Sequence, residues 1–139
     1  MKLVVDASVA IKWFLVERPS ELYVDEAQAV GQAIDEKGAE LFAPPHWIAE
    51  VLGVLCRLDP DIVDGAMETF LDLRPTVLQD GPVLVRATGL SISLRHHLFD
   101  TLYHAVALET GATLVTADER YFEKSRQVGS ITLLKDFAA

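Results

Sequence analysis

The segment LFDTLYHAVALETGATLVTAD, residues 98–118, constrains the fold more than any other part of the chain. Apolar residues recur at helical spacing after Asp100, and Gly111 stands where a helix commonly ends with a positive φ. Residues 113–116, TLVT, are rich in β-branched types and too few for another helix, so they predict a buried strand. Asp100 therefore begins a helix, and Asp118 follows the end of a strand.

Short apolar runs alternate with helical patterns along the rest of the chain. We expect strands at 2–5, 41–43, 76–79, 113–116 and 131–134. We expect helices within 7–14, from a cap at Ser20 to Gly38, and within 46–57, 59–75, 82–94, 98–111 and 119–127. No tight hairpin signal joins two strands, which favours parallel pairing through helical crossovers. The pattern predicts an α/β fold with a parallel sheet of four to five short strands.

The composition fits one globular domain spanning residues 1–139. Half of the residues are hydrophobic, and no low-complexity run or linker divides the chain. The apolar start is interrupted by Asp6 and Lys12, and no later segment approaches the length of a membrane span, so we expect a cytoplasmic protein. The single Cys56 lies among apolar helical residues, and we expect a buried, inert thiol.

The formal net charge of −9 argues against a nucleic-acid partner, because such proteins usually carry a basic patch. That argument weakens if several acids converge on bound cations, which would cancel their charge locally. What then matters is whether basic residues surround the site. The candidates are Arg18, Arg57, Arg95, Arg120, Lys124 and Arg126.

Four acids occupy positions that would bring them to one edge of such a sheet. Asp6 and Asp118 each follow a strand, Asp100 begins the helix before the second of these strands, and Glu50 interrupts an apolar helical stripe. Ligands of open α/β sheets bind outside the carboxyl ends of the strands. Clustered, buried carboxylates must hold protons or bind cations. We therefore expect a common site.

Mg²⁺ or Mn²⁺ suits this set, because both are hard ions that prefer carboxylate oxygens. A carboxylate-held ion that is open on one side can activate water for phosphodiester hydrolysis. The sequence leaves open whether one ion or two are bound. Ser8 and Thr116, each two residues from a key aspartate, are expected to orient a carboxylate or a metal-bound water.

Each residue also has an ordinary structural interpretation. Asp6, Asp100 and Asp118 are suitable helix caps or turn residues, and Glu50 is compatible with the rim of a packed helix. A core or solvated position is the favoured interpretation of His96, His97 and His104. The case for a site therefore rests on the four acids as a set.

The fragments VVDASV, PHWIAEVLGVL, FDTLYHAVA and LVTADERYF together resemble the PIN-domain nucleases. The small size is similar to that of the VapC-type toxins of bacterial toxin–antitoxin pairs. The resemblance runs from about Lys2 to Phe137, and it rests on four acids in this order.

The resemblance implies a three-layer α/β/α fold and an Mg²⁺- or Mn²⁺-dependent endoribonuclease that is inhibited by a cognate antitoxin. It makes Asp6, Glu50, Asp100 and Asp118 the acidic quartet, and Thr116 the hydroxyl residue before the last acid. It also implies a homodimer, for which the aromatic N-terminal helices are candidates. Family members often have Asn three residues after the second acid, where this chain has Gly53.

Two other functions remain open at this stage. A noncatalytic PIN-like module would keep the fold and bind a protein partner. A phosphatase or phosphoacceptor would use Asp6 as its nucleophile, but the phosphatase pattern needs an acid two residues later, where this chain has Ser8.

Overall fold

A computed structural model describes residues 1–15 and 17–138 of the chain. Five strands form one sheet in the order β3-β2-β1-β4-β5, and every pairing is parallel. The strands are β1 (Lys2–Val5), β2 (Glu40–Ala43), β3 (Thr76–Val77), β4 (Thr113–Thr116) and β5 (Ile131–Leu133). The prediction of an α/β fold with a parallel sheet is confirmed.

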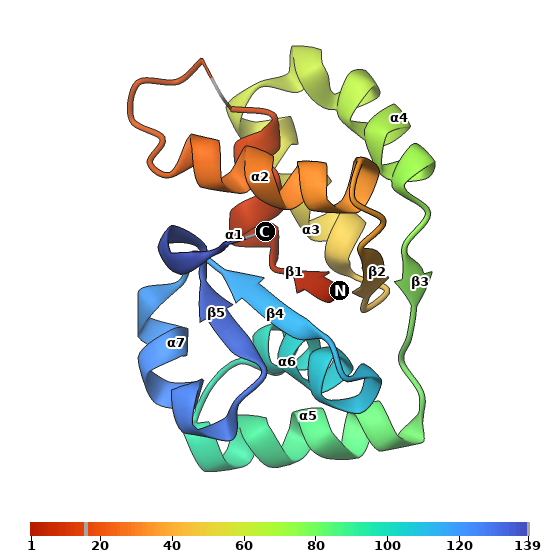
Figure 1. The fold of residues 1–139 in the computed structure, drawn as a ribbon, viewed down its shortest axis with the longest axis vertical. Helices are drawn as coiled ribbons and strands as arrows, with labels where there is room; N and C mark the ends of the chain where they lie inside the picture. Colours follow the sequence, from red (N-terminus) through yellow and green to blue (C-terminus); the bar gives the residue numbers. More distant parts are fainter. Residues whose placement is uncertain (16, 139) are drawn as a thin grey trace.

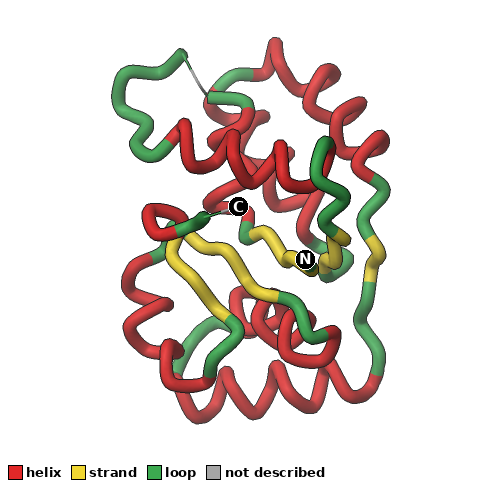
Figure 2. Tube along the Cα trace, viewed as in Figure 1, coloured by secondary structure: helices red, strands yellow, loops and turns green. Residues whose placement is uncertain are grey.

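The helices cover both faces of the sheet, which gives three layers (Figure 1). They are α1 (Ala7–Ala10), α2 (Val24–Asp35), α3 (Trp47–Leu58), α4 (Val63–Leu73), α5 (Gly81–Leu94), α6 (Leu98–Thr110) and α7 (Glu119–Ser125). Short 3₁₀ helices complete the set as η1 (Ile11–Trp13), η2 (Pro60–Ile62), η3 (Arg126–Val128) and η4 (Leu134–Asp136). Figure 2 shows the strands enclosed between α1–α4 on one side and α5–α7 on the other.

The central strands are buried on both faces, as parallel strands flanked by helices must be. In β1, Leu3, Val4 and Val5 are all buried, and β4 contributes a continuous buried run from Leu114 to Thr116. Helix α6 packs against β1, β2 and β4 and buries seven consecutive residues from Thr101 to Ala107. This double-sided burial explains why these strands appear in the sequence as apolar runs without alternation.

The strand register places Asp6 beside Thr116. Val5 of β1 pairs with Val115 of β4, so the residues that follow these two partners are neighbours at the carboxyl edge of the sheet. The residue after Val5 is Asp6, and the residue after Val115 is Thr116. The central position of β1, between β2 and β4, puts Asp6 in the middle of that edge.

Two local expectations were wrong. Helix α2 begins at Val24 after Tyr23, which adopts a left-handed conformation and is 43% exposed, so Ser20 does not cap the helix and Tyr23 is not on its buried face. Cys56 is exposed, because it lies on the outer side of α3. Apolar neighbours in a sequence do not settle which side of a helix faces the core.

Among the described residues, no helix combines the length and the apolar character needed to cross a lipid bilayer.

Two glycines provide a matched test of the fold. Gly111 ends α6 with φ +73°, whereas Gly53 lies within α3, and a Cβ at either position would meet no atom within 4 Å. We expect Gly111→Ala to lower the free energy of unfolding by about 1 kcal/mol, because the left-handed conformation strains an L residue. Gly53→Ala should raise it by about 0.5–1 kcal/mol through helix propensity. Urea denaturation measures both, and destabilisation by both changes would contradict the assignment of Gly53 to open space.

Candidate active site

Asp6 is held at the carboxyl end of β1 by its backbone. Its N–H donates to the Val115 carbonyl oxygen at 3.0 Å and extends the β1–β4 ladder by one residue. Its carbonyl accepts the first bonds of α1, from Val9 N–H at 2.9 Å and Ala10 N–H at 3.1 Å. The Asp6 side chain makes no capping hydrogen bond. The main chain therefore begins the helix and leaves the carboxylate available for other contacts.

Two hydroxyls fix one oxygen of that carboxylate. Ser8 Oγ–H donates to Asp6 Oδ2 at 2.5 Å, and Thr116 Oγ1–H donates to the same oxygen at 3.0 Å. Ser8 Oγ in turn accepts from the Ala117 N–H at 3.1 Å. The hydroxyls of Ser8 and Thr116 thus orient Asp6, and they join the strand ends of β1 and β4.

Asp118 caps α7 and also faces the site. Its Oδ1 accepts from the Tyr121 N–H at 3.0 Å, which satisfies an amide at the helix N-terminus. Its own N–H donates to Thr116 Oγ1 at 3.1 Å. The ordinary interpretation of Asp118 as a cap is therefore correct, and it does not exclude a second role, because capping uses one carboxylate oxygen.

Asp100 lies in the first turn of α6 and accepts from His96 Nε2 at 2.9 Å through Oδ2. With Asp6 and Asp118 it lines one small cleft, whose remaining walls are Leu114, Thr116 and Tyr121. The fold thus brings together three acids that are far apart in the sequence.

These three carboxylates share one arrangement. In each, one oxygen is held by the protein: Oδ2 of Asp6, Oδ2 of Asp100 and Oδ1 of Asp118. Within residues 1–15 and 17–138, the second oxygen of each accepts no hydrogen bond from the protein. Each acid is therefore oriented by the protein and keeps one oxygen available to a ligand.

Glu50 lies beside this cleft without lining it. It projects from the first turn of α3, where its Oε2 accepts from the Tyr103 hydroxyl at 2.7 Å and lies 3.6 Å from His46 Nε2. Burial and this hydrogen bond raise the pKa of Tyr103, so its hydroxyl keeps its proton and remains a donor to Glu50. The negative charge of Glu50 is close enough to raise the pKa of Asp6.

Burial raises the pKa of Asp6 from 3.8 to about 6, against the opposing effect of its hydrogen bonds from Ser8 and Thr116. The charges of Asp100 and Glu50 add to the rise. Among the described residues, no Lys or Arg forms an ion pair with Asp6. A partly buried carboxylate with acidic neighbours and no cationic partner fits a divalent cation, and the oxygen-rich donor set fits Mg²⁺ or Mn²⁺.

Three polar contacts of the site were not identified from the sequence. They come from His96, Tyr103 and Lys124. Of these, only Lys124 was named from the sequence as a residue that could surround the site. His96 and Asp100 are four residues apart, which is a detectable signal, but the helix begins between them. His104 is a core residue, as expected, because it is fully buried between Tyr121 Oη at 2.8 Å and the Gly129 carbonyl at 2.7 Å.

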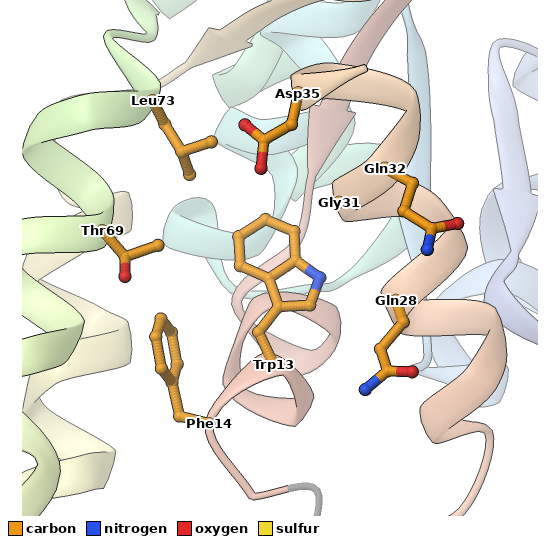
Figure 3. Close-up of a pocket in the computed structure, with 8 residues that line it drawn as sticks. All are labelled: Trp13, Phe14, Gln28, Gly31, Gln32, Asp35, Thr69 and Leu73. Carbon is orange, nitrogen blue, oxygen red and sulfur yellow. The ribbon is translucent and has the colours of Figure 1, made fainter. Parts of the chain in front are cut away.

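A second hollow lies away from the acids, between α2 and α4 (Figure 3). Trp13 occupies its middle, with Phe14 beside it, and its walls are Gln28, Gly31, Gln32, Asp35, Thr69 and Leu73. Both aromatic rings also pack within the chain, since the ring centroid of Trp13 lies 6.4 Å from that of Trp47 and that of Phe14 lies 5.5 Å from that of Phe70. None of the four acids lines this groove.

The raised pKa of Asp6 predicts an unusual effect of Asp6→Asn on stability. A carboxyl whose pKa is raised in the folded protein makes its full contribution to stability at pH values below 3.8, its ordinary pKa. That contribution is lost as the pH rises through about 6. At pH 7 without metal, Asp6→Asn should therefore stabilise the protein. The shift allows at most about 3 kcal/mol, and because Asp6 is only partly buried we expect about 1–2 kcal/mol.

Thermal denaturation with a chelator, at pH 7 and near pH 4, measures this effect, and the difference between the two proteins should shrink at the lower pH. Glu68→Gln removes an exposed carboxylate from α4 and serves as the matched control, with a change within about 0.5 kcal/mol. A loss of stability in Asp6→Asn at pH 7 would show that the Asp6 charge does not oppose folding.

Comparison with known proteins gives a consistent family and fold. The family model "PIN domain" matches residues 3–127. The VapBC-1 structure from nontypeable Haemophilus influenzae is similar with a TM-score of 0.68 and 17% identity, over 98% of this chain and 100% of that one. PAE2754 from Pyrobaculum aerophilum gives a TM-score of 0.65 and 17% identity, over 97% and 90% of the two chains.

VapBC2 from Rickettsia felis, bound to a DNA fragment from its promoter, gives a TM-score of 0.65 and 14% identity, over 96% of this chain and 97% of that one. No curated protein matches the sequence. At these identities the solved structures establish the fold alone, whereas the family model covers most of the chain. The chain belongs to the PIN domain family of nucleases.

Proposed function

We propose that the chain is an Mg²⁺- or Mn²⁺-dependent endoribonuclease that acts as the toxin of a toxin–antitoxin pair. The observation that carries this proposal is the cleft in which Asp6, Asp100 and Asp118 meet, with Glu50 beside it. Three oriented carboxylates, each with one oxygen available, are suited to hold a divalent cation at the carboxyl edge of the sheet.

A divalent cation bound there would activate water and offset the charge that develops on a phosphodiester. The chain's own residues prepare that chemistry. Ser8 and Thr116 keep the carboxylate of Asp6 in one orientation, and the Tyr103 hydroxyl keeps Glu50 directed to the site. Because the acids are fixed before a ligand arrives, little reorganisation is needed when it binds.

Single-stranded RNA is the substrate we propose, and two exposed aromatic residues beside the acids support it. Phe99 precedes Asp100, is 61% exposed, and packs against the His46 ring at a centroid distance of 5.2 Å. Tyr23 lines a surface hollow together with Asp118 and Lys12. Unpaired bases stack on such rings, whereas bases within a duplex do not present their faces.

A cognate antitoxin is the protein partner we propose. Two of the similar structures, VapBC-1 and VapBC2, support this partner. We further propose that residues 1–139 act as one nuclease domain, that the protein is a homodimer, and that it acts in the cytoplasm, where its RNA substrate is found. A homodimer contact through Trp13 and Phe14 would have to use the faces of these rings that do not pack against Trp47 and Phe70.

The alternative function is a noncatalytic PIN-like module that binds a protein. The groove of Figure 3 favours it, because a hollow lined by Trp13, Phe14 and Leu73 suits an apolar side chain of a partner. The two functions differ in their need for metal. Partner binding without metal uptake would favour the module.

Metal binding by the purified protein tests the proposed function without knowledge of the RNA target. We expect wild type to bind Mn²⁺ in calorimetry, and we expect Asp6→Asn and Asp100→Asn each to weaken binding by at least about 10-fold, because each removes a charged ligand. Glu68→Gln should bind like wild type, since it alters charge away from the cleft.

The same variants then separate metal binding from cleavage. Induced expression of wild type in a bacterial host should arrest growth and fragment RNA, whereas Asp6→Asn and Asp100→Asn should do neither while remaining folded. Full cleavage by both variants would contradict the proposed site. No Mn²⁺ uptake by wild type, with or without a single-stranded RNA oligonucleotide, would favour the noncatalytic module.

Stacking on Phe99 predicts a specific pattern of RNA affinity. Phe99→Ala should weaken binding of a fluorescent single-stranded oligonucleotide by about 10-fold, which corresponds to the loss of one stacked base. Phe99→Trp should keep the affinity and Phe99→Leu should not, because stacking needs a π-face. The contact between the Phe99 carbonyl and His46 Nε2, at 2.9 Å, is made by the main chain, so none of these side-chain changes removes its acceptor. Equal affinity of the Leu and Trp variants would rule out stacking.

A further inference from the structure

Two polar contacts connect Lys124 to His96 and His96 to Asp100. Lys124 Nζ lies 3.2 Å from His96 Nδ1, and His96 Nε2 lies 2.9 Å from Asp100 Oδ2. The atoms of His96, Asp100 and Asp118 that are able to bind a metal lie within 4.8 Å of one another. His96 is therefore placed either to coordinate a metal itself or to orient Asp100.

Hydrogen-bond chemistry decides between these two roles. The ammonium of Lys124 has three donors and no acceptor, so His96 Nδ1 must accept from it. The proton of a neutral imidazole then resides on Nε2, which donates to Asp100 Oδ2. A nitrogen that carries a proton has no lone pair for a metal. Lys124 therefore prevents coordination through the nitrogen of His96 that faces the acids.

The surroundings of His96 leave it little freedom to adopt another geometry. Its backbone N–H donates to the Ser91 carbonyl at 3.1 Å, and its carbonyl accepts from Ser91 Oγ at 2.6 Å. Its ring packs on the Tyr121 ring at a centroid distance of 4.7 Å, and its side chain is only 10% exposed. Lys124 Nζ also donates to the Arg95 carbonyl at 3.3 Å, so the same residue fixes the segment before α6.

We propose that His96 is a positioning residue for Asp100, and that Lys124 holds it in the tautomer that donates to the carboxylate and does not bind metal. The site is thereby kept to oxygen ligands and selects Mg²⁺ or Mn²⁺ over ions that prefer imidazole, such as Zn²⁺ and Ni²⁺. The selectivity rests on the proposed function, in which Asp100 binds metal. The tautomer itself does not depend on it.

The tautomer can be measured in the metal-free protein. Nitrogen-15 NMR of the imidazole groups distinguishes a protonated from an unprotonated ring nitrogen, and His96→Gln assigns the signals. We expect the proton on Nε2 in wild type and a mixed population in Lys124→Met, because this change keeps the length of the side chain and loses its donors, while Asp100 still accepts from Nε2. Lys37→Met alters an exposed lysine beyond α2 and should leave the His96 signals unchanged. A proton on Nδ1 in wild type would overturn the proposal.

Calorimetry with Mn²⁺ and with Zn²⁺ tests the consequence. His96→Ala should weaken Mn²⁺ binding by about 10-fold, as expected when a partner of a ligating carboxylate is lost. His96→Gln offers an amide donor at a similar reach and should restore most of that affinity. In Lys124→Met the tautomer with an unprotonated Nε2 becomes accessible, which should raise the affinity for Zn²⁺ relative to Mn²⁺ by about 10-fold.

The outcomes separate this inference from the proposed function. If His96→Gln selectively loses Zn²⁺ affinity, or if the Gln and Ala variants bind Mn²⁺ equally, His96 is not an orienting donor and the inference is wrong. If wild type binds neither metal, the proposed function fails, and the NMR measurement still decides the tautomer. Activity is not needed for either readout.

Discussion

The charge of Asp6 is the constraint on which the site depends. Asp6 follows the central strand of the parallel sheet in a partly buried position, and this burial, together with the charges of Asp100 and Glu50, raises its pKa to about 6. Two hydroxyls offset part of this effect, but they are neutral donors and leave the net charge unchanged. The folded chain therefore contains an electrostatic imbalance that a cation would relieve.

The fold distributes the support of this site over segments far apart in the sequence. Asp6 is oriented by Ser8 of α1 and by Thr116 at the end of β4, while Asp100 is oriented by His96 of the α5–α6 connection, which Lys124 of α7 contacts in turn. Glu50 depends on a tyrosine of α6. Asp6, Glu50 and Asp100 each receive a hydrogen bond from outside the element that carries them, so the geometry of the site exists only once the layers have assembled.

The elements that could be predicted from the sequence are those in which local pattern and burial agree. β1 and β4 are short β-branched runs buried on both faces, and Gly111 marks the end of α6 through its own positive φ. Tyr23 and Cys56 were misplaced, because periodicity does not reveal where a helix begins or which side of it meets a neighbour. The placement of the four acids, and of Ser8 and Thr116 beside Asp6, followed from the strand and helix pattern, whereas the contacts of His96, Tyr103 and Lys124 did not.

His96 shows why the partners were missed. It lies before α6, next to Arg95 in a left-handed conformation, so its four-residue separation from Asp100 is not a spacing within one helix and is only a weak signal. Its other contacts, with Tyr121 and Lys124, are made across a gap of more than twenty residues. Such contacts depend on how two helices pack, and a single sequence contains no direct signal for that packing.

The short helix α7 has a consequence for motion. It spans only Glu119–Ser125, too few residues to be stable without tertiary contacts, yet it supplies Tyr121 and Lys124 and is capped by Asp118. Local unfolding of this helix would release the cap, the ring that supports His96 and the ammonium group in one event. Occupancy of the acidic cleft and the opening equilibrium of α7 are therefore thermodynamically linked, so a ligand in the cleft lowers the open population and slows amide exchange in a helix whose outer surface it does not touch.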